Sequence, residues 1–245
     1  EYDDGWKTVS NTSEQVAVHH YSDRFDVVFD FMDIIQWPFD KGLAIQEIAH
    51  KALGLEFDPL NETVARITVK EEELELKKPY VCISTQSLAQ CKFWNYPNGW
   101  AEIIQYLKSR GYGVVCVDKK QHYKNTISSD IIFRHDKIIE ETIGTINGAE
   151  FLIGLSSGLS WVAWGLNKHV VLISGFTDEN HEFKTKCERV FNSNVCNNCF
   201  GKYPLDPQNW DWCPDQENTE RMFECTKQIT PDMVKSAINN VIQHK

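Results

Sequence analysis

Four cysteines near the C-terminal end of the chain have the spacing of a metal site. They are Cys196, Cys199, Cys213 and Cys225, in the pattern Cys-x2-Cys-x13-Cys-x11-Cys. Two residues between the first two allow a single turn to present both thiolates to one ion. The later two complete the four-sulfur set that suits zinc or iron. Because four protein ligands leave no open position for a substrate, we expect this ion to be structural.

Two alternatives remain for these cysteines, a pair of disulfides and free thiols. Disulfides are favoured in secreted proteins. The first residues, EYDDGWKTVS, lack the basic stretch and apolar run of a signal peptide, although a removed leader would leave no trace. Cys82 and Cys116 differ from the four, because they lie in apolar, strand-like runs where a buried thiol behaves as a small hydrophobe. Cys91 and Cys187 lie in polar contexts, as loop thiols or spare ligands.

The composition indicates a globular protein. The chain has 245 residues, of which 42% are hydrophobic, enough to bury a core. The net charge of −10 argues against nucleic acid or an anionic membrane as the main partner. No apolar run approaches the length of a membrane span.

Between Lys77 and Ser174, apolar strand-like runs alternate with helical periodicity, which is typical of a parallel sheet covered by helices. The pattern predicts strands over 79–84, 112–118, 150–154 and 169–174, and helices over 98–111, 135–149 and 159–167. We therefore predict an α/β fold, a doubly wound parallel sheet of at least four strands.

The two ends of the chain differ from this central unit. Near the N-terminus, 24–32 resembles a strand and 41–56 a helix, which together are too short to form a domain. Near the C-terminus, Thr230 is a candidate N-cap, with a proline after it and helical apolar spacing beyond. We expect a reduced N-terminal α/β segment with a linker (1–76), a Rossmann-like domain (77–190), the four-cysteine loop (191–228) and a closing helix (229–245).

Polar side chains follow the first strand of the central unit. Ligands of such sheets collect beyond the C-terminal ends of the strands. Here Ser84, Thr85 and Gln86 offer hydroxyl and amide donors, and Lys92 offers a mobile positive charge. A lysine among small polar residues at a strand end predicts a phosphate ligand, with a solvent-facing lysine as the alternative.

A Gly/Ser turn follows the third predicted strand and leads into a helix. Gly154, Ser156, Ser157 and Gly158 would present free backbone N–H groups and the positive end of the helix dipole to an anion. The alternative is an ordinary glycine turn, since the sequence is neither G-x-G-x-x-G nor a P-loop.

Asp118 ends the second predicted strand, where a carboxylate can bind ribose hydroxyls, although a loop aspartate is the alternative. Together with the two other segments it predicts a pocket for a sugar nucleotide or nucleoside diphosphate. A redox cofactor is disfavoured, because no glycine fingerprint follows the first strand.

From about Tyr80 to its end, the chain resembles the C-terminal half of bacterial autotransporter heptosyltransferases, which are ADP-heptose-using glycosyltransferases of the GT-B fold. The resemblance rests on segments 80–115 and 150–176 and on the pattern CNNC…WCP…FEC. It implies transfer of heptose from ADP-heptose to serine residues of surface adhesins in the cytoplasm, a form of protein O-glycosylation. It also implies a structural iron ion and a possible homo-oligomer.

The resemblance assigns roles to particular residues. Lys92 matches the donor-phosphate lysine, the segment from Ser156 to Leu159 matches the pyrophosphate loop, and the four cysteines match the metal ligands. The catalytic base of the family is an aspartate in an N-terminal Rossmann-like domain, and its motif is not found here. The candidates Asp23, Asp26, Asp30 and Asp33 cluster in the N-terminal segment, and none is preferred.

Two functions are therefore open. The first is an inverting glycosyltransferase, in which Lys92 and the helix N-terminus stabilise the departing diphosphate without a divalent ion. The second is a non-catalytic, metal-stapled subunit that binds a nucleotide sugar or a protein partner.

Overall fold

A computed structural model of the chain describes residues 43–58, 66–69, 79–87, 89–119, 131–134, 137–203, 205–206 and 208–243. Within these ranges six strands form one sheet, in the order β3-β2-β1-β4-β5-β6, and every neighbouring pair is parallel. The strands are β1 (Tyr80–Ile83), β2 (Gly113–Cys116), β3 (Ile132–Phe133), β4 (Phe151–Leu155), β5 (His169–Ile173) and β6 (Cys187–Val190). Strand order runs outward in both directions from β1 and β4, so the prediction of a doubly wound parallel sheet is confirmed.

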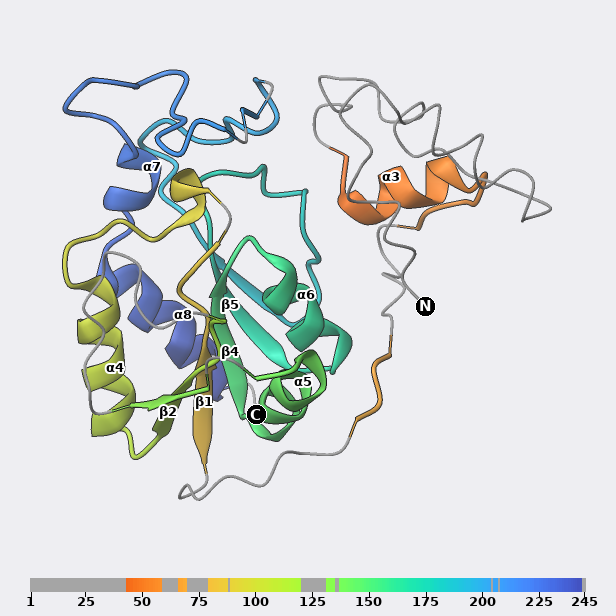
Figure 1. Cartoon of the computed structure of the whole chain (residues 1–245), viewed down its shortest axis with the longest axis vertical. Coiled ribbons are helices and arrows are strands. Elements are labelled where there is room, and N and C mark those ends of the chain that lie inside the picture. Colours follow the sequence, from red (N-terminus) through yellow and green to blue (C-terminus); the bar gives the residue numbers. More distant parts are fainter. Residues whose placement is uncertain are drawn as a thin grey trace.

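Two pairs of helices cover the sheet. Helices α4 (Gly99–Ser109) and α8 (Pro231–Gln243) lie on one side, and α5 (Ile139–Gly148) and α6 (Gly158–Gly165) lie on the other (Figure 1). These four helices fall within the predicted ranges or one residue beyond them. The N-cap expected at Thr230 is present, because its Oγ1 accepts the Met233 N–H at 3.4 Å. Three short helices complete the described chain: α3 (Ile45–Ala52), η2 (Gln90–Lys92) and α7 (Glu224–Lys227).

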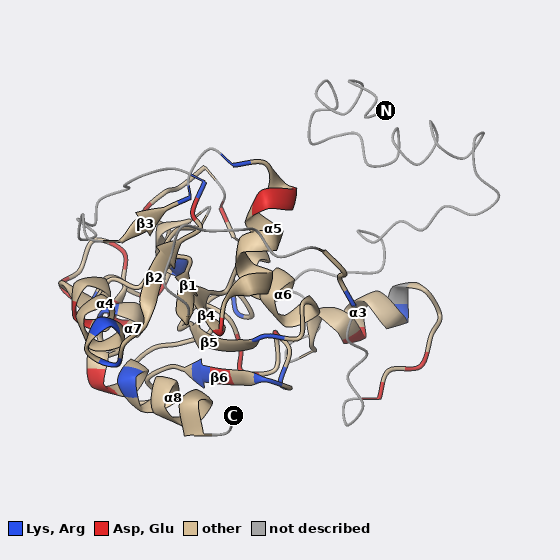
Figure 2. Ribbon diagram, turned by 90° about the horizontal axis from the view of Figure 1, so that it is seen from below, with Lys and Arg blue, Asp and Glu red and all other residues tan. Residues whose placement is uncertain are grey.

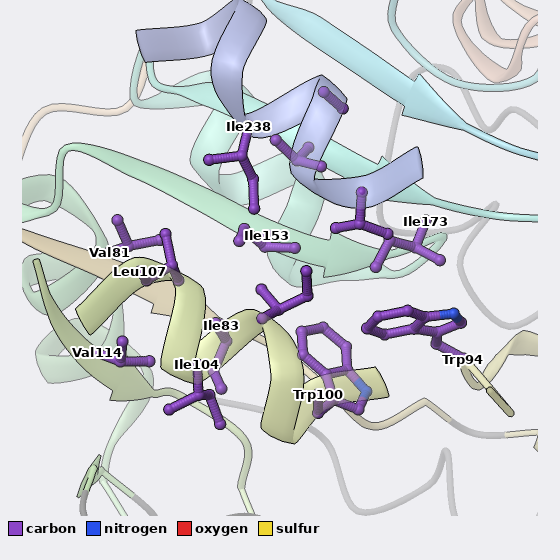
Figure 3. Packing of buried hydrophobic residues seen from close by; sticks show 14 of the residues in the cluster. Val81, Ile83, Trp94, Trp100, Ile104, Leu107, Val114, Ile153, Ile173 and Ile238 are labelled. Atoms are coloured by element: carbon purple, nitrogen blue, oxygen red, sulfur yellow. The ribbon is translucent and has the colours of Figure 1, made fainter. Parts of the chain in front are cut away.

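The larger part of the core lies between the sheet and the α4–α8 pair. In Figure 3, Ile104 and Leu107 from α4 and Ile238 from α8 point toward the sheet. They meet Val81 of β1 and Ile153 of β4, and all five side chains are fully buried. Each contributes roughly 1.5–3 kcal/mol through burial, which fixes the sheet on which the site is built.

Alternate residues of β1 face opposite sides of the sheet, as the period of a strand requires. Val81 and Ile83 join the α4–α8 side, whereas Tyr80 and Cys82 join the side covered by α5 and α6. Cys82 and Cys116 are buried strand residues, as predicted, and burial raises the pKa of both thiols.

The N-terminal part of the described chain contacts the domain through backbone hydrogen bonds. The Ile45 N–H at the start of α3 donates to the His181 carbonyl at 3.0 Å, and the Ile67 N–H donates to the Gly165 carbonyl at 3.0 Å. Helix α3 confirms part of the helix predicted over 41–56. The strand predicted over 24–32 and the four candidate base aspartates lie outside the described residues.

The prediction did not include β3 and β6. β3 is only two residues long, and β6 reads CERV, the one strand in the described ranges that carries Asp, Glu, Lys or Arg (Figure 2). Both are edge strands, where one flank faces outward and apolar runs are not required. Among the described helices, none has the length and apolarity needed to cross a membrane.

Candidate functional site

The predicted site residues lie at the C-terminal edge of the sheet, around the switch point between β1 and β4. Ser84 directly follows β1, and its N–H still pairs with the Ile153 carbonyl of β4 at 2.9 Å. Asp118 follows β2, and Ser156 follows β4. In open α/β sheets the crevice at such a switch point is the general place for ligands.

Asp118 anchors the loop that leaves β1. Its carboxylate accepts the Thr85 N–H, with both oxygens at 2.9 Å, and the Thr85 hydroxyl at 2.6 Å. It also accepts the Ser84 hydroxyl at 3.1 Å and the Gln86 N–H at 3.3 Å. Asp118, Ser84 and Thr85 are buried, and Gln86 is half-buried. The structure therefore places Asp118 as a tie between the ends of β1 and β2, and the ribose contact suggested by the sequence stays a prediction.

A second buried network holds the turn before α6. The Ser156 hydroxyl donates to the Glu182 carboxylate, which also accepts the Thr177 hydroxyl at 2.9 Å. Arg189 of β6 completes an ion pair with Glu182 and donates to the Thr177 carbonyl at 2.8 Å. Glu182 is only 2% exposed, so its charge depends on these partners.

Sequence reasoning did not identify Glu182, Thr177 or Arg189. They stand in and around a polar segment between β5 and β6 with no apolar periodicity and no recognised motif. The one sequence feature that could have pointed to this network is Arg189, a charged residue inside a short strand. It indicates a buried ion pair only once its partner Glu182 is known.

The N-terminus of α6 is open toward solvent. Ser157 is its N-cap, with extended backbone, and Gly158 is its first residue and is exposed. A Cβ placed on Gly158 would meet nothing within 4 Å. Gly154 is the opposite case, because a Cβ there would lie 2.7 Å from the Ser160 Oγ. Close packing of α6 against β4 thus leaves the positive end of the helix facing free space.

Lys92 ends η2 in the loop between β1 and α4. Its Nζ lies 5.1 Å from the centroid of the Phe176 ring, in the range of a cation–π contact. Burial lowers the pKa of Lys92, whereas neighbouring Cys91 and Glu182 act in the opposite direction. Lys92 is therefore partly buried against an aromatic ring, which argues against the alternative of a fully solvent-facing lysine.

The cysteine loop, residues 191–228, packs on the loop that carries Lys92. In Figure 1 the yellow segment with η2 lies beside the blue segment with α7. Asn95 donates to the Thr226 hydroxyl at 2.8 Å, and the Phe93 and Trp210 rings meet edge to face at 5.7 Å. One buried cluster joins both loops to Phe176; its members are Ala89, Cys91, Phe176, Cys199, Trp212, Cys213 and Phe223.

All eight cysteines lie within the described residues, and no disulfide joins any two of them. A hydrogen bond between Cys225 and Cys196 raises the pKa of the first and lowers that of the second. Burial raises the pKa of Cys199 to about 12 and also raises that of Cys213. The Cys213 sulfur accepts the Phe223 N–H at 3.4 Å.

The four thiols of the cysteine loop suit zinc or iron as a donor set. Three of them are buried, and one receives a backbone N–H of the kind that supports metal thiolates. No group of three or more His, Cys, Asp and Glu side chains in the described ranges is arranged as a metal site. The four cysteines thus fit the predicted ion in type, the structure does not bring them together as a metal site, and metal binding stays a proposal.

Comparison with known proteins places the chain in a family. The model of glycosyltransferase family 9 (heptosyltransferase) matches residues 6–203. The autotransporter heptosyltransferase TibC of Escherichia coli O78:H11 is 41% identical over 202 residues, which cover 78% of this chain and 49% of that protein. BAHTCr of Citrobacter rodentium, an autotransporter heptosyltransferase, is 42% identical over 174 residues, 68% of this chain and 42% of that protein.

A third relative is BimC of Burkholderia thailandensis, named an inactive autotransporter heptosyltransferase. It is 35% identical over 202 residues, which cover 79% of this chain and 47% of that protein. The chain thus spans about half the length of the curated relatives it matches.

Solved structures of other proteins have a similar fold. The crystal structure of dodecameric, iron-containing TibC with ADP-D-β-D-heptose has a TM-score of 0.75 and 38% identity, covering 82% of this chain and 54% of that chain. A family 9 glycosyltransferase of Veillonella parvula shares the fold at 11% identity, with a TM-score of 0.57 and coverage of 84% and 62%. Because the family model spans most of the chain and relatives above 30% identity match more than two thirds of it, the chain belongs to glycosyltransferase family 9, the heptosyltransferases.

Proposed function

We propose that this chain is an autotransporter-type heptosyltransferase and that its parallel sheet forms the donor-binding side. The donor is ADP-heptose, and the acceptor is a serine hydroxyl of a surface protein. The observation that carries the proposal is that Glu182 links the two parts of the site: it acts on the pKa of the partly buried Lys92, and its carboxylate accepts the Ser156 hydroxyl beside the open N-terminus of α6. Its relative TibC was crystallised with ADP-D-β-D-heptose, which supports the choice of donor.

The geometry suggests a division of labour on the donor side. Lys92 and the backbone N–H groups of the segment Ser156–Leu159 would face the diphosphate, where negative charge develops as the sugar leaves. Ser84, Thr85 and Asp118 would shape the loop that holds Gln86 and Lys92 toward the donor. An inverting transfer further needs a base that deprotonates the acceptor hydroxyl. We assign that base to no described residue.

We also propose that Cys196, Cys199, Cys213 and Cys225 hold one structural iron or zinc ion. Such an ion would crosslink a loop that has only one short helix, α7, in its described part. The description of TibC as iron-containing supports iron. By the same resemblance, we propose that the protein works in the cytoplasm and assembles with copies of itself, as TibC is described as a dodecamer.

A second function has support from one comparison. BimC, which is 35% identical, is named an inactive autotransporter heptosyltransferase. The alternative proposal is therefore a non-catalytic, metal-stapled subunit that binds a nucleotide sugar or a protein partner. Both proposals place the donor nucleotide on the same edge of the sheet.

The decisive experiment measures donor binding and transfer separately. Isothermal titration with ADP-heptose, GDP-heptose and UDP-heptose should give binding for the adenine nucleotide. Lys92→Ala should weaken it about 10- to 100-fold, the scale of a charge-assisted hydrogen bond. Donor binding that is unaffected in Lys92→Ala would refute the site. Binding without hydrolysis or transfer, in the presence of the serine-containing acceptor, would favour the non-catalytic alternative.

A further inference from the structure

We propose that Phe176 is a positioning residue for Lys92, and that its ring is one path by which the cysteine loop supports the donor site. The inference rests on the proposed role of Lys92 in binding the donor diphosphate. It adds a residue between β5 and the cysteine loop that no motif indicates.

Phe176 is enclosed on the side facing the cysteine loop. It follows β5 by three residues and is only 2% exposed. Its ring centroid lies 5.1 Å from that of Phe200 and 5.9 Å from that of Trp212, which meets it edge to face. Aromatic pairs in this range of distances pack favourably beyond the area they bury. The ring is thus backed by two aromatic residues of the cysteine loop.

Backbone contacts fix the turn that carries the ring. The Phe176 carbonyl accepts the Phe200 N–H at 3.2 Å, and the Gly175 carbonyl accepts the Asn198 N–H at 3.0 Å. Gly175 also lies so close to the cysteine loop that a Cβ there would be 2.7 Å from the Cys225 carbonyl oxygen. These contacts leave Phe176 little freedom to turn away from Lys92.

The Lys92 ammonium lies over the same ring, at 5.1 Å from Nζ to the centroid. A lysine side chain has a long flexible stem, so its position at a binding site must otherwise be ordered when the ligand arrives. A ring face attracts the ammonium and restricts it, yet it does not neutralise its charge. An ordered ammonium with its charge intact is a prepared ligand for a diphosphate.

Glu182, the carboxylate that acts on the pKa of Lys92, does not take over this positioning role. Glu182 contributes to the pKa of Lys92, but its carboxylate already accepts Ser156, Thr177 and Arg189. A direct ion pair with a carboxylate would have to be broken before a phosphate could bind. The aromatic contact avoids that competition.

The test compares ADP affinity in three variants by isothermal titration. Phe176→Leu should weaken ADP binding about 2- to 30-fold, which corresponds to the range of a cation–π contact. Phe176→Tyr keeps the aromatic face and should bind ADP within about twofold of the unmodified chain. Phe151→Leu is the matched control, since Phe151 is fully buried at the start of β4, at the opposite edge of the sheet. It should lower stability and leave ADP affinity unchanged.

Equal ADP affinity in Phe176→Leu and the unmodified chain would overturn the inference, and so would an equal loss in Phe151→Leu. A second measurement does not depend on the folding of any Phe176 variant. Reductive ¹³C-methylation followed by NMR, with the Lys92 signal assigned by Lys92→Arg, should show an upfield ring-current shift at Lys92. A Lys92 signal at the position of an exposed lysine would contradict the contact.

The outcomes separate this inference from the proposed function. If the unmodified chain binds neither ADP nor ADP-heptose, the proposed function fails, while the NMR measurement still tests the contact between Lys92 and Phe176. If the unmodified chain binds ADP and Phe176→Leu binds it equally well, only the inference fails.

Discussion

The Asp118 carboxylate accepts the backbone N–H of Thr85, with both oxygens at 2.9 Å, and so joins the ends of two neighbouring strands. This contact sets the direction in which the chain leaves β1 and begins the loop that reaches Lys92. A carboxylate is suited to this role because it accepts several donors at once. The geometry of the proposed donor side thus begins with a buried carboxylate that need not touch the donor.

Asp118→Asn should destabilise the fold. The amide offers one acceptor oxygen in place of two and adds N–H donors that would face other donors. Leaving buried donors without partners should lower the free energy of unfolding by about 2–4 kcal/mol. Urea denaturation followed by circular dichroism measures this, with Asp211→Asn as the control, since Asp211 is exposed. A change no larger than in the control would contradict the anchoring role.

Glu182→Gln should cost more than a typical surface change, because it leaves the Arg189 guanidinium without its carboxylate. Removing one partner of a buried ion pair costs about 3–5 kcal/mol. A double-mutant cycle with Arg189→Met measures the coupling. We expect the double variant to lose less than the sum of the two single losses. Strict additivity would show that the pair is not coupled.

Donor affinity should fall at alkaline pH, and earlier than for an ordinary lysine. Burial lowers the pKa of Lys92, so its ammonium loses its proton at a lower pH than in the unfolded chain. Folding stability runs in the opposite direction. Because the unfolded chain holds this proton more tightly, stability rises as pH rises between the folded and the unfolded pKa.

Titration of ADP binding against pH tests this effect of Lys92. Lys92→Arg should remove the alkaline loss, since a guanidinium stays charged. Lys235→Ala on α8 serves as the control for a lost positive charge and should keep the profile of the unmodified chain. An alkaline loss that persists in Lys92→Arg would assign it to another group.

Two glycine substitutions should separate packing from ligand access. Gly175→Ala places a Cβ 2.7 Å from the backbone oxygen of Cys225, and overpacking of this kind costs about 1–3 kcal/mol. Gly158→Ala meets nothing within 4 Å and should be neutral or stabilise by up to about 1 kcal/mol. If the donor diphosphate approaches the N-terminus of α6, Gly158→Ala should nevertheless weaken ADP-heptose binding. Thermal unfolding of each variant measures its stability, and isothermal titration measures its affinity for ADP-heptose.

Metal content should be close to one ion per chain after anaerobic purification, as measured by mass spectrometry of the metals. Cys213→Ser should lose the ion and lower the melting temperature. Cys187→Ser is the control for loss of a thiol, since Cys187 lies in β6, and it should retain the metal. A chain that folds with no ion and with oxidised cysteines would refute the metal proposal.

The hydrophobic pattern of short segments predicted the central strands and the helices that cover them. The apolar runs of β1, β2, β4 and β5 and the spacing of the covering helices identified the doubly wound sheet, because a strand buried on both faces must be apolar throughout. The two edge strands escaped prediction for the same reason. The charged residues of β6 carry no strand signal of their own.

The candidate site was predictable by segment and not by contact. Strand ends and the glycine turn placed Ser84 and Ser156 at the C-terminal edge of the sheet, as in the structure, and donor binding by these residues and Lys92 stays a prediction. The pairing of Glu182 with Arg189 and the placement of Phe176 over Lys92 depend on side chains brought together by the tertiary fold. No residue spacing in the surrounding sequence predicts these contacts.

The contact between Gly175 and Cys225 bears on whether the cysteine loop is a separable module. The turn after β5 has no room for a side chain at Gly175. The sheet and the cysteine loop are therefore packed directly against each other. Deleting residues 191–228 would not yield a smaller, intact domain, because it would expose Phe176 and the apolar floor beneath the loop. Grafting the loop onto another sheet would require a glycine at the matching turn. For protein engineering, the loop and the strand turn beneath it are therefore best exchanged as one unit.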